Sequence, residues 1–528
     1  MPIILSHRSK TKKYLEFILI GGVLLFSVLL VLRQANPART LLGRDAGAFA
    51  YIGSLILRGD APYQTAWDSK PPGTFLVNAA ALWLGKGTRW GIWSLELLSL
   101  FSASSFAFLA LRKQFGIAPA LLASLAWLYG LNFILIGGNL TEEYSLFFSF
   151  LSLFLFSLSL NTKSSFWLDF GIGVCAGSSF LFRPNNIGTQ ISIALTILIF
   201  AVINKQYFAG LRRLATIGLS APIPLVLLSL YLAYKGSLYA FWEAAVLYNF
   251  SYAGSHLFNP IGAFASGQEF IGFPAHIALV GVVAAAGNIL LAIKHRNEIS
   301  PFLLWTLLAF ILEVILSGLS GRNYEHYFIN WLPSIAFACA FFIVQVFPRL
   351  ADWAQRHALT FTTIMAVFLG ISFWDMPNTY WKSIQPILSG NPRIQYIDPI
   401  SEYVNANTEP GQTVLVWGGQ AGINFLSRRD APTPYLFYPG YVPSRITNRI
   451  SEDFYNTLVT NPPTLIVDGS IYDSNAIIPI STEDPNAWFI EQNVYSVPFI
   501  TETLKFIREN YILIDTVNEA YIYRLKQQ

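Results

Sequence analysis

Long apolar runs fill most of the first 374 residues, and short polar segments separate them. A membrane-spanning helix needs about 20 mostly apolar residues. We predict eleven spans, at about residues 14–32, 91–111, 117–136, 145–160, 166–182, 186–203, 214–233, 273–293, 301–317, 327–348 and 358–374. The further apolar run Thr74–Leu84 is too short to cross comfortably, so we expect it to be an interfacial helix against the outer leaflet.

The pattern changes after residue 374, where Pro, Asn, Asp and Glu occur at levels typical of soluble proteins. Strand-like runs at 413–417, 464–468 and 511–514 alternate with helix-like patterns at 451–460 and 498–509. This alternation predicts a small α/β domain. We therefore expect a transmembrane domain over 1–374, with a long first outer loop at 33–90, followed by a soluble domain over 375–528.

Composition supports an α-helical polytopic membrane protein. Only 12% of the 528 residues are charged and 54% are hydrophobic, whereas soluble domains carry about 25% charged residues. The net charge of +4 is too small to argue for a nucleic-acid partner. Cys175 and Cys339 both lie in apolar runs, which argues against a disulfide framework.

Basic residues near span ends favour the cytoplasm. The basic segment His7–Lys13 precedes the first run, which we interpret as an uncleaved helix with a cytoplasmic N-terminus. The other candidate cytoplasmic loops hold Arg112–Lys113, Lys163, Lys205–Arg213, Lys294–Arg296 and Arg349–Arg356. Eleven spans place the C-terminal domain outside the cytoplasm, and we expect a multi-pass protein of the plasma membrane.

Charged groups gather on the side of the membrane that this topology assigns to the exterior. Such groups near membrane depth are costly and usually mark function or pair with one another. They are Arg44, Asp45, Asp68, Lys70, Glu142, Glu143, Arg183, Glu313, Arg322, Glu325 and His326. Arg and Lys bind phosphate, and a carboxylate can take the proton of an attacking hydroxyl. The set suits transfer of a sugar from a lipid-phosphate donor.

Most of these groups also have a plain structural explanation. Arg44–Asp45 could be a solvated loop pair, and Asp68–Pro72 could be a turn. Glu142–Glu143 could be the acidic first turn of a helix capped by Thr141. Arg183 and Arg322 could be snorkelling anchors, and His326 could be an ordinary interfacial histidine.

Several segments resemble family 39-type glycosyltransferases of the GT-C class, the group of protein O-mannosyltransferases and the lipid A aminoarabinose transferase. Gly43–Tyr51 resembles the family's first-loop segment, which holds its catalytic Asp, and Asp68–Gly73 resembles its Lys-Pro-Pro motif. Glu142–Tyr144 occupies the place of its second acidic motif, without the usual Asp and Pro. Further segments resemble bacterial members of the family, namely Ser320–Phe328 with Leu332–Pro333, Val416–Gly418 and Pro462–Asp468.

The resemblance implies a polyprenyl-phosphate sugar donor and transfer on the non-cytoplasmic face. Asp45 is then the expected general base, and Glu142 or Glu143 would support it or position the acceptor. The candidates for donor-phosphate contact are Lys70, Arg183, Arg322 and His326. No cofactor is required, and a divalent metal is possible but not indicated, because Arg and Lys can supply positive charge.

The sequence leaves the sugar open, and also the acceptor, which could be a glycan, a lipid or a protein. Two rival functions remain at this point. A polysaccharide polymerase or ligase would use similar chemistry on longer donors. A secondary transporter would place its charges at mid-membrane and show internal repeats, and we find neither pattern in the sequence.

Overall fold

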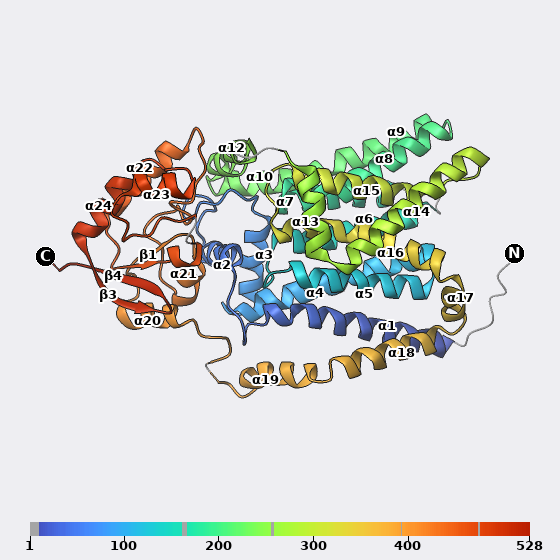
Figure 1. Ribbon diagram of the computed structural model, residues 1–528, viewed down its shortest axis with the longest axis horizontal. Coiled ribbons are helices and arrows are strands. Elements are labelled where there is room, and N and C mark those ends of the chain that lie inside the picture. The colour runs from blue at the N-terminus through green and yellow to red at the C-terminus, as the bar shows by residue number, and fades with distance from the viewer. Residues whose placement is uncertain (1–9, 161–165, 255–257, 392, 474–475, 528) are drawn as a thin grey trace. The chain divides into compact units, whose positions relative to one another are not determined.

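The computed structural model describes residues 10–160, 166–254, 258–391, 393–473 and 476–527, which are mostly helical with one small sheet (Figure 1). The basic residues His7–Ser9 and the cytoplasmic-loop candidate Lys163 lie outside the described residues. The predicted fold class, a helical polytopic membrane protein with a small C-terminal α/β part, is confirmed.

All eleven predicted spans are helical in the structure. The helices concerned are α1 (Lys10–Val31), α4 (Arg89–Phe115), α5 (Ile117–Ile134), α6 (Thr141–Ser159), α7 (Phe166–Phe182), α8 (Gly188–Ile203), α9 (Tyr207–Ser220), α10 (Pro222–Tyr234), α14 (Phe273–His295), α15 (Pro301–Gly318), α16 (Leu332–Val346) and α18 (Ala358–Ser372). The last is followed by α19 (Met376–Leu388), which lies beyond the predicted spans. Two of them, α9 and α10, together form one apolar stretch over the range predicted as one span.

Within the described residues, eight stretches are long and apolar enough to cross a membrane, or nine if α18 and α19, bent by 68°, count as one span. Fewer therefore qualify by length and composition than the eleven we predicted. The helix α7 has only 17 residues, and α6 begins with two glutamates within its 19 residues. The predicted interfacial segment is α3 (Gly73–Leu84), a 12-residue apolar helix.

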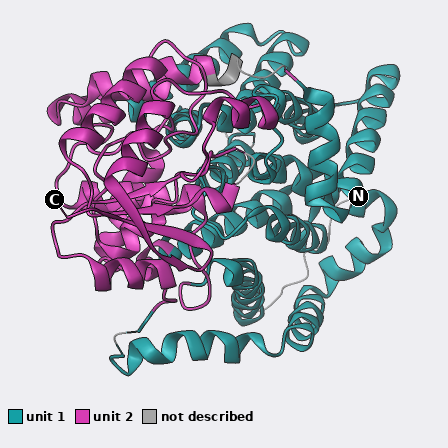
Figure 2. Cartoon of the chain, turned by 60° about the vertical axis from the view of Figure 1, so that its left-hand side comes forward, with its two compact units in different colours: residues 1–36, 93–226, 259–394 teal, residues 37–92, 227–258, 395–528 magenta. Residues whose placement is uncertain are grey.

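The chain divides into two compact units, each assembled from three separate stretches (Figure 2). Unit 1 holds residues 1–36, 93–226 and 259–394, and unit 2 holds residues 37–92, 227–258 and 395–528. The predicted first outer loop thus supplies α2 (Arg44–Leu57) and α3 to the same unit as the C-terminal region. The predicted boundary at residue 374 stays a prediction about where the membrane part ends.

Unit 1 is a bundle of the long helices together with α13 (Pro260–Ile271) and α17 (Pro348–Arg356). Its core is built from apolar side chains that are almost wholly buried, such as Trp127 on α5, Trp305 on α15 and Phe337 on α16. Small residues let helices approach closely. A Cβ on Gly281 of α14 would lie 2.2 Å from the carbonyl oxygen of Ala338 on α16, as is typical of membrane helix packing.

Unit 2 contains a four-stranded sheet of order β1-β2-β4-β3. The strands are β1 (Val414–Trp417), β2 (Leu465–Asp468), β3 (Tyr511–Val517) and β4 (Ala520–Leu525). The first two pair in parallel, and β4 pairs antiparallel with both β2 and β3. The other elements of this unit are α11 (Leu238–Phe241), α12 (Tyr248–Gly254), α20 (Pro399–Asn407), α21 (Gly422–Ser427), α22 (Thr447–Thr460), α23 (Pro485–Gln492) and α24 (Ile500–Asn510).

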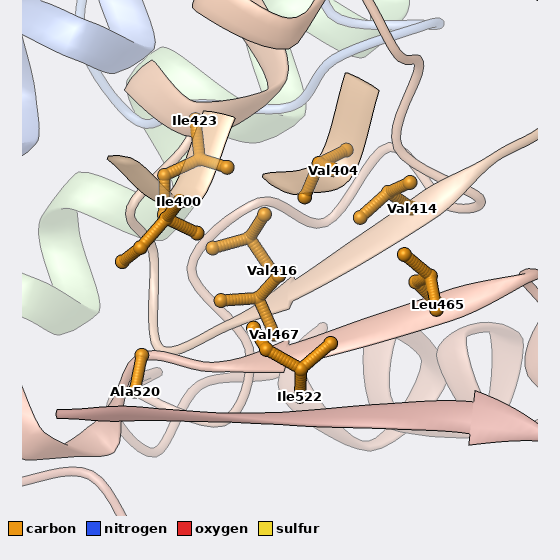
Figure 3. Close-up of a cluster of buried hydrophobic side chains, with 9 residues drawn as sticks. All are labelled: Ile400, Val404, Val414, Val416, Ile423, Leu465, Val467, Ala520 and Ile522. Carbon is orange, nitrogen blue, oxygen red and sulfur yellow. The ribbon is translucent and has the colours of Figure 1, made fainter. Parts of the chain in front are cut away.

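The three predicted strands and both predicted helices of this region are present, whereas β4 was not predicted. A buried apolar cluster beside the sheet joins Val414 and Val416 of β1 to Val467 of β2 and Ile522 of β4 (Figure 3). Because both β1 and β2 are buried throughout, they read in the sequence as continuous apolar runs, which is typical of parallel strands.

Candidate functional site

Asp45 lies in the first turn of α2, one residue after the helix begins at Arg44. A carboxylate at this position is favoured because the N-terminal end of a helix carries partial positive charge. The helix is held against α21 by a close backbone approach, since a Cβ on Gly47 would lie 2.8 Å from Cα of Gly422. The adjacent Arg44 donates from Nη1 to Oδ2 of Asp473 at 2.9 Å. Asp45 is thus fixed in place by packing rather than carried on a loose loop.

Lys70 lies beside Asp45. Its Nζ is 3.1 Å from Oδ2 of Asp45 and 3.8 Å from Oδ1 of Asp68. Two aromatic rings flank the ammonium group, with centroids 5.1 Å away for Phe49 and 5.8 Å away for Phe437. Both rings offer their faces to a cation. The side chains of Lys70 and Asp45 keep 29% and 34% exposure, so both can be reached from outside the protein.

The segment around Lys70 is anchored by backbone contacts. Tyr63 donates from its hydroxyl to the carbonyl of Lys70 at 2.8 Å, and Asn249 donates to the carbonyl of Ser69 at 2.5 Å. The backbone N–H of Lys70 donates to Oδ1 of Asp68 at 2.9 Å. Asp68 therefore shapes the turn and also faces the ammonium group.

Asp68 is a buried carboxyl with 1% exposure, and its Oδ2 has no hydrogen-bond partner. Burial raises the pKa of Asp68, because desolvation disfavours the charged form and outweighs the opposing effect of Lys70. Two neighbouring buried polar atoms, Nε1 of Trp67 and the hydroxyl of Tyr441, also lack partners, and the two rings meet edge to face at 5.3 Å. Unpaired buried groups are costly. These three atoms of unit 2 can each still form a hydrogen bond.

A second set of predicted residues meets in unit 1. The guanidinium of Arg183, just after α7, donates to Oε1 of Glu142 at the start of α6. It also lies over the ring of Tyr327, with Cζ 3.6 Å from the centroid. Thr141 donates to the other oxygen of Glu142 at 2.7 Å. Glu142 and Arg183 thus form an ion pair inside the protein, with Arg183 retaining a fifth of its side-chain exposure.

Glu143 faces a different partner from Glu142. Its carboxyl is hydrogen-bonded to that of Glu96 on α4 and accepts from the backbone N–H of Leu140. Glu96 in turn accepts from the backbone N–H of Asn139 at 2.5 Å. Both glutamates are buried. Glu143 therefore holds the loop before α6, and of the two predicted glutamates only Glu142 lies with a predicted phosphate ligand.

His326 and Arg322 are connected to the pair of Glu142 and Arg183 by the rings of Tyr324 and Tyr327. The His326 ring meets Tyr327 edge to face at 4.8 Å and stacks on Tyr324 at 5.9 Å. Arg322 donates from Nη1 to the hydroxyl of Tyr324 at 3.1 Å. The segment 322–327 thus carries two of the predicted residues and the ring on which Arg183 rests.

The structure therefore brings Asp45 and Lys70 together in unit 2, and Glu142, Arg183 and His326 together in unit 1. Sequence analysis missed Phe437, which flanks Lys70 from 367 residues away, and Tyr327, which supports Arg183. No local signal points to Phe437, whereas Tyr327 lies inside the segment Ser320–Phe328 that resembles the family, although it was not singled out. Among the described residues, no group of three or more His, Cys, Asp or Glu side chains is placed to hold a metal ion.

The sequence matches no family model, and no curated protein matches it. Solved structures do resemble the fold. A crystal structure of ArnT from Cupriavidus metallidurans bound to undecaprenyl phosphate has a TM-score of 0.57 at 12% identity, covering 98% of this chain and 100% of that chain.

The oligosaccharyltransferase of Archaeoglobus fulgidus, tethered to an acceptor peptide, has a TM-score of 0.51 at 13% identity, covering 98% of this chain and 75% of that chain. Both are membrane-embedded glycosyltransferases of the GT-C class. The chain has the fold of GT-C glycosyltransferases.

Proposed function

We propose that the chain is a membrane glycosyltransferase that moves a sugar from a polyprenyl-phosphate donor to an acceptor hydroxyl on the non-cytoplasmic face. The fold supports the general reaction, since the similar ArnT structure holds undecaprenyl phosphate. In this proposal the reaction needs no metal or cofactor, because the chain's own cations meet the phosphate. The acceptor is a hydroxyl of a glycan, a lipid or a protein.

The observation that carries the proposal is the pairing of Asp45 with Lys70 at 3.1 Å. A transferase of this kind needs a cation for the lipid phosphate and a carboxylate for the acceptor proton. Here the two groups are adjacent, and both remain partly exposed. Lys70 is the proposed ligand of the donor phosphate, and Asp45 is the proposed general base.

In the reaction, the acceptor oxygen attacks C1 of the donor sugar and the bond from C1 to the phosphate oxygen breaks. Asp45 takes the proton of the acceptor hydroxyl, and the leaving lipid phosphate keeps the bonding electron pair. Negative charge builds on the phosphate as it leaves, so an ammonium held beside it stabilises the transition state. The aromatic faces of Phe49 and Phe437 restrict Lys70 to this place.

In unit 1 the proposed phosphate ligands are Arg183, which follows α7, and the pair Arg322 and His326, which share the segment 322–327. Glu142 is proposed to orient Arg183, because its carboxylate occupies one side of the guanidinium. Arg has five N–H donors, so pairing with Glu142 leaves others for an anion.

Binding of undecaprenyl phosphate to the purified chain tests the proposal. Lys70→Gln removes the charge, and we expect affinity to fall about tenfold or more, the scale of a lost charge-assisted hydrogen bond. Lys382→Gln is the matched control, because Lys382 is exposed on α19. Equal affinities for the two variants, or no binding by the wild-type chain, would overturn the proposal.

A further inference from the structure

A small pocket lies next to Arg183 in unit 1 and is lined also by Asn185, Glu313, Leu316, Ser317, Tyr327 and Asn330. The space that it encloses holds little more than a water molecule. It therefore has room for a single polar group, such as one hydroxyl, rather than for a whole sugar ring.

Glu313 is the unusual member of this pocket. It projects from α15 with 2% exposure, and it accepts a hydrogen bond from the backbone N–H of Thr189 at the start of α8. Its second oxygen, Oε2, has no partner. The first contact caps α8 and accounts for one oxygen only.

The absence of a side chain at Gly188 leaves space for this carboxyl group. Gly188, the first residue of α8, would place a Cβ 2.2 Å from Oε1 and 2.9 Å from Oε2 of Glu313. No side chain fits there while the carboxyl stays in place. An unpaired carboxyl oxygen at membrane depth is costly, and such groups usually mark function.

The neighbouring amides use only part of their hydrogen-bonding capacity. Asn185 donates to the carbonyl of Leu316 at 3.2 Å, and Asn330 donates to Oδ1 of Asn186 at 2.7 Å. Each amide thus keeps a second N–H and its oxygen for other partners. A pocket lined by such groups suits a hydroxyl, which can both donate and accept hydrogen bonds.

We propose that this pocket is a subsite for one hydroxyl of the transferred sugar, which forms a hydrogen bond with Oε2 of Glu313. The inference rests on the proposed function, because Arg183 in the same pocket is a proposed ligand of the donor phosphate. It assigns Glu313 to recognition of the sugar and not to proton transfer. A donor whose sugar lacks that hydroxyl would leave Oε2 unpaired and would bind more weakly.

Binding measurements on the purified full-length chain separate the subsite from the phosphate site. The ligands are undecaprenyl phosphate alone and its esters with glucose, galactose, mannose and xylose. We expect the wild-type chain to bind one ester at least about tenfold more tightly than the bare lipid phosphate. Glu313→Gln should lose that increment while still binding undecaprenyl phosphate as the wild type does. Glu269→Gln, an exposed glutamate of the same unit, should keep the increment.

Gly188→Ala provides a second variant that leaves the carboxyl chemistry intact. Its Cβ displaces Glu313, so we expect the same loss of the increment for the sugar. An increment that survives in both variants, or that no ester shows with the wild type, would overturn the subsite and leave the proposed function standing. Failure of the wild type to bind undecaprenyl phosphate would instead overturn the proposed function, and the subsite with it.

Discussion

Lys70 Nζ lies 3.1 Å from Oδ2 of Asp45, so the proposed phosphate ligand and the proposed base form an ion pair. This contact links the two roles. A donor phosphate that approaches Lys70 competes with Asp45 for the ammonium, and engagement of Lys70 by phosphate leaves Asp45 freer to accept a proton. Asp68 lies 3.8 Å from the same ammonium, so a carboxyl group remains beside Lys70 when Asp45 turns to the acceptor.

The predicted topology places the first outer loop and the loop between α14 and α15 on opposite sides of the membrane. Single cysteines at Thr65 and at Asn297, both exposed, should react with an impermeant reagent from the outside and from the cytoplasm, respectively. Cys175 and Cys339 are buried and should give little background. Labelling of both positions from one side would refute the topology.

The close approach of α2 to α21 makes Gly47 sensitive to substitution. In Gly47→Ala the new Cβ would meet Cα and N of Gly422 at 2.8 and 2.9 Å. Backbone must shift to relieve this contact, so we expect a loss of about 1–3 kcal/mol of stability, seen as a lower apparent Tm. Gly22→Ala in α1, where no neighbouring atom lies within 4 Å, should not lower it. Equal Tm values would mean that this packing does not hold α2.

Burial of Asp68 predicts a pH dependence of stability. Its pKa is raised in the folded chain, so the protonated form stabilises the fold. That contribution is present below the unfolded value of about 3.9 and is lost as pH rises through the raised pKa. Asp68→Asn has no such loss, so the Tm of the variant minus that of the wild type should increase as pH rises from about 4. Asp60→Asn, which is partly exposed, should show a flat difference, and a flat difference for Asp68→Asn would contradict the assignment.

Much of the fold could be predicted from the sequence because single segments encode it. Apolar runs long enough to span a membrane became helices, and the continuous apolar runs 413–417 and 464–468 became the buried parallel strands β1 and β2. The strand β4 was missed although Tyr521, Ile522 and Tyr523 are of residue types enriched in strands. The available signal was the pair Asn518–Glu519, both at positive φ in the turn from β3 to β4, a conformation typical of two-residue hairpins.

The residues of the candidate site could be predicted only where they lie in a recognisable local motif. The motifs singled out Asp45 and Lys70, which do meet. They could not separate Glu142 from Glu143, since the distinction depends on Arg183 and Glu96, each about 40 or more residues away in the sequence. The role of Glu313 was equally out of reach, because it depends on the missing side chain of Gly188.

Arg322 provides a test of the cations in unit 1. We expect Arg322→Ala to slow transfer about tenfold or more, because a charge-assisted contact with the donor is worth roughly 1.5–3 kcal/mol. The control is Arg356→Ala on α17, an exposed residue that donates to Asp352 of its own helix and that the topology places in the cytoplasm. Equal rates for the two variants in a lipid-donor assay would remove Arg322 from the site.

The central claim is that Asp45 accepts the proton of the acceptor hydroxyl. Asn has nearly the same shape as Asp but cannot take a proton, so Asp45→Asn should slow turnover at least about a hundredfold. Because the substitution also removes the carboxylate that competes for Lys70, the variant should bind undecaprenyl phosphate at least as tightly as the wild type. Loss of turnover without loss of binding separates a missing base from a damaged fold.

The most direct measurement is single-turnover transfer from a purified undecaprenyl-phosphate sugar by the wild type, Asp45→Asn and Asp60→Asn. We predict that Asp60→Asn transfers at the wild-type rate and that Asp45→Asn is at least about a hundredfold slower at saturating donor. Wild-type turnover by Asp45→Asn would contradict the account, since Asp45 would then be only a charge that partners Lys70.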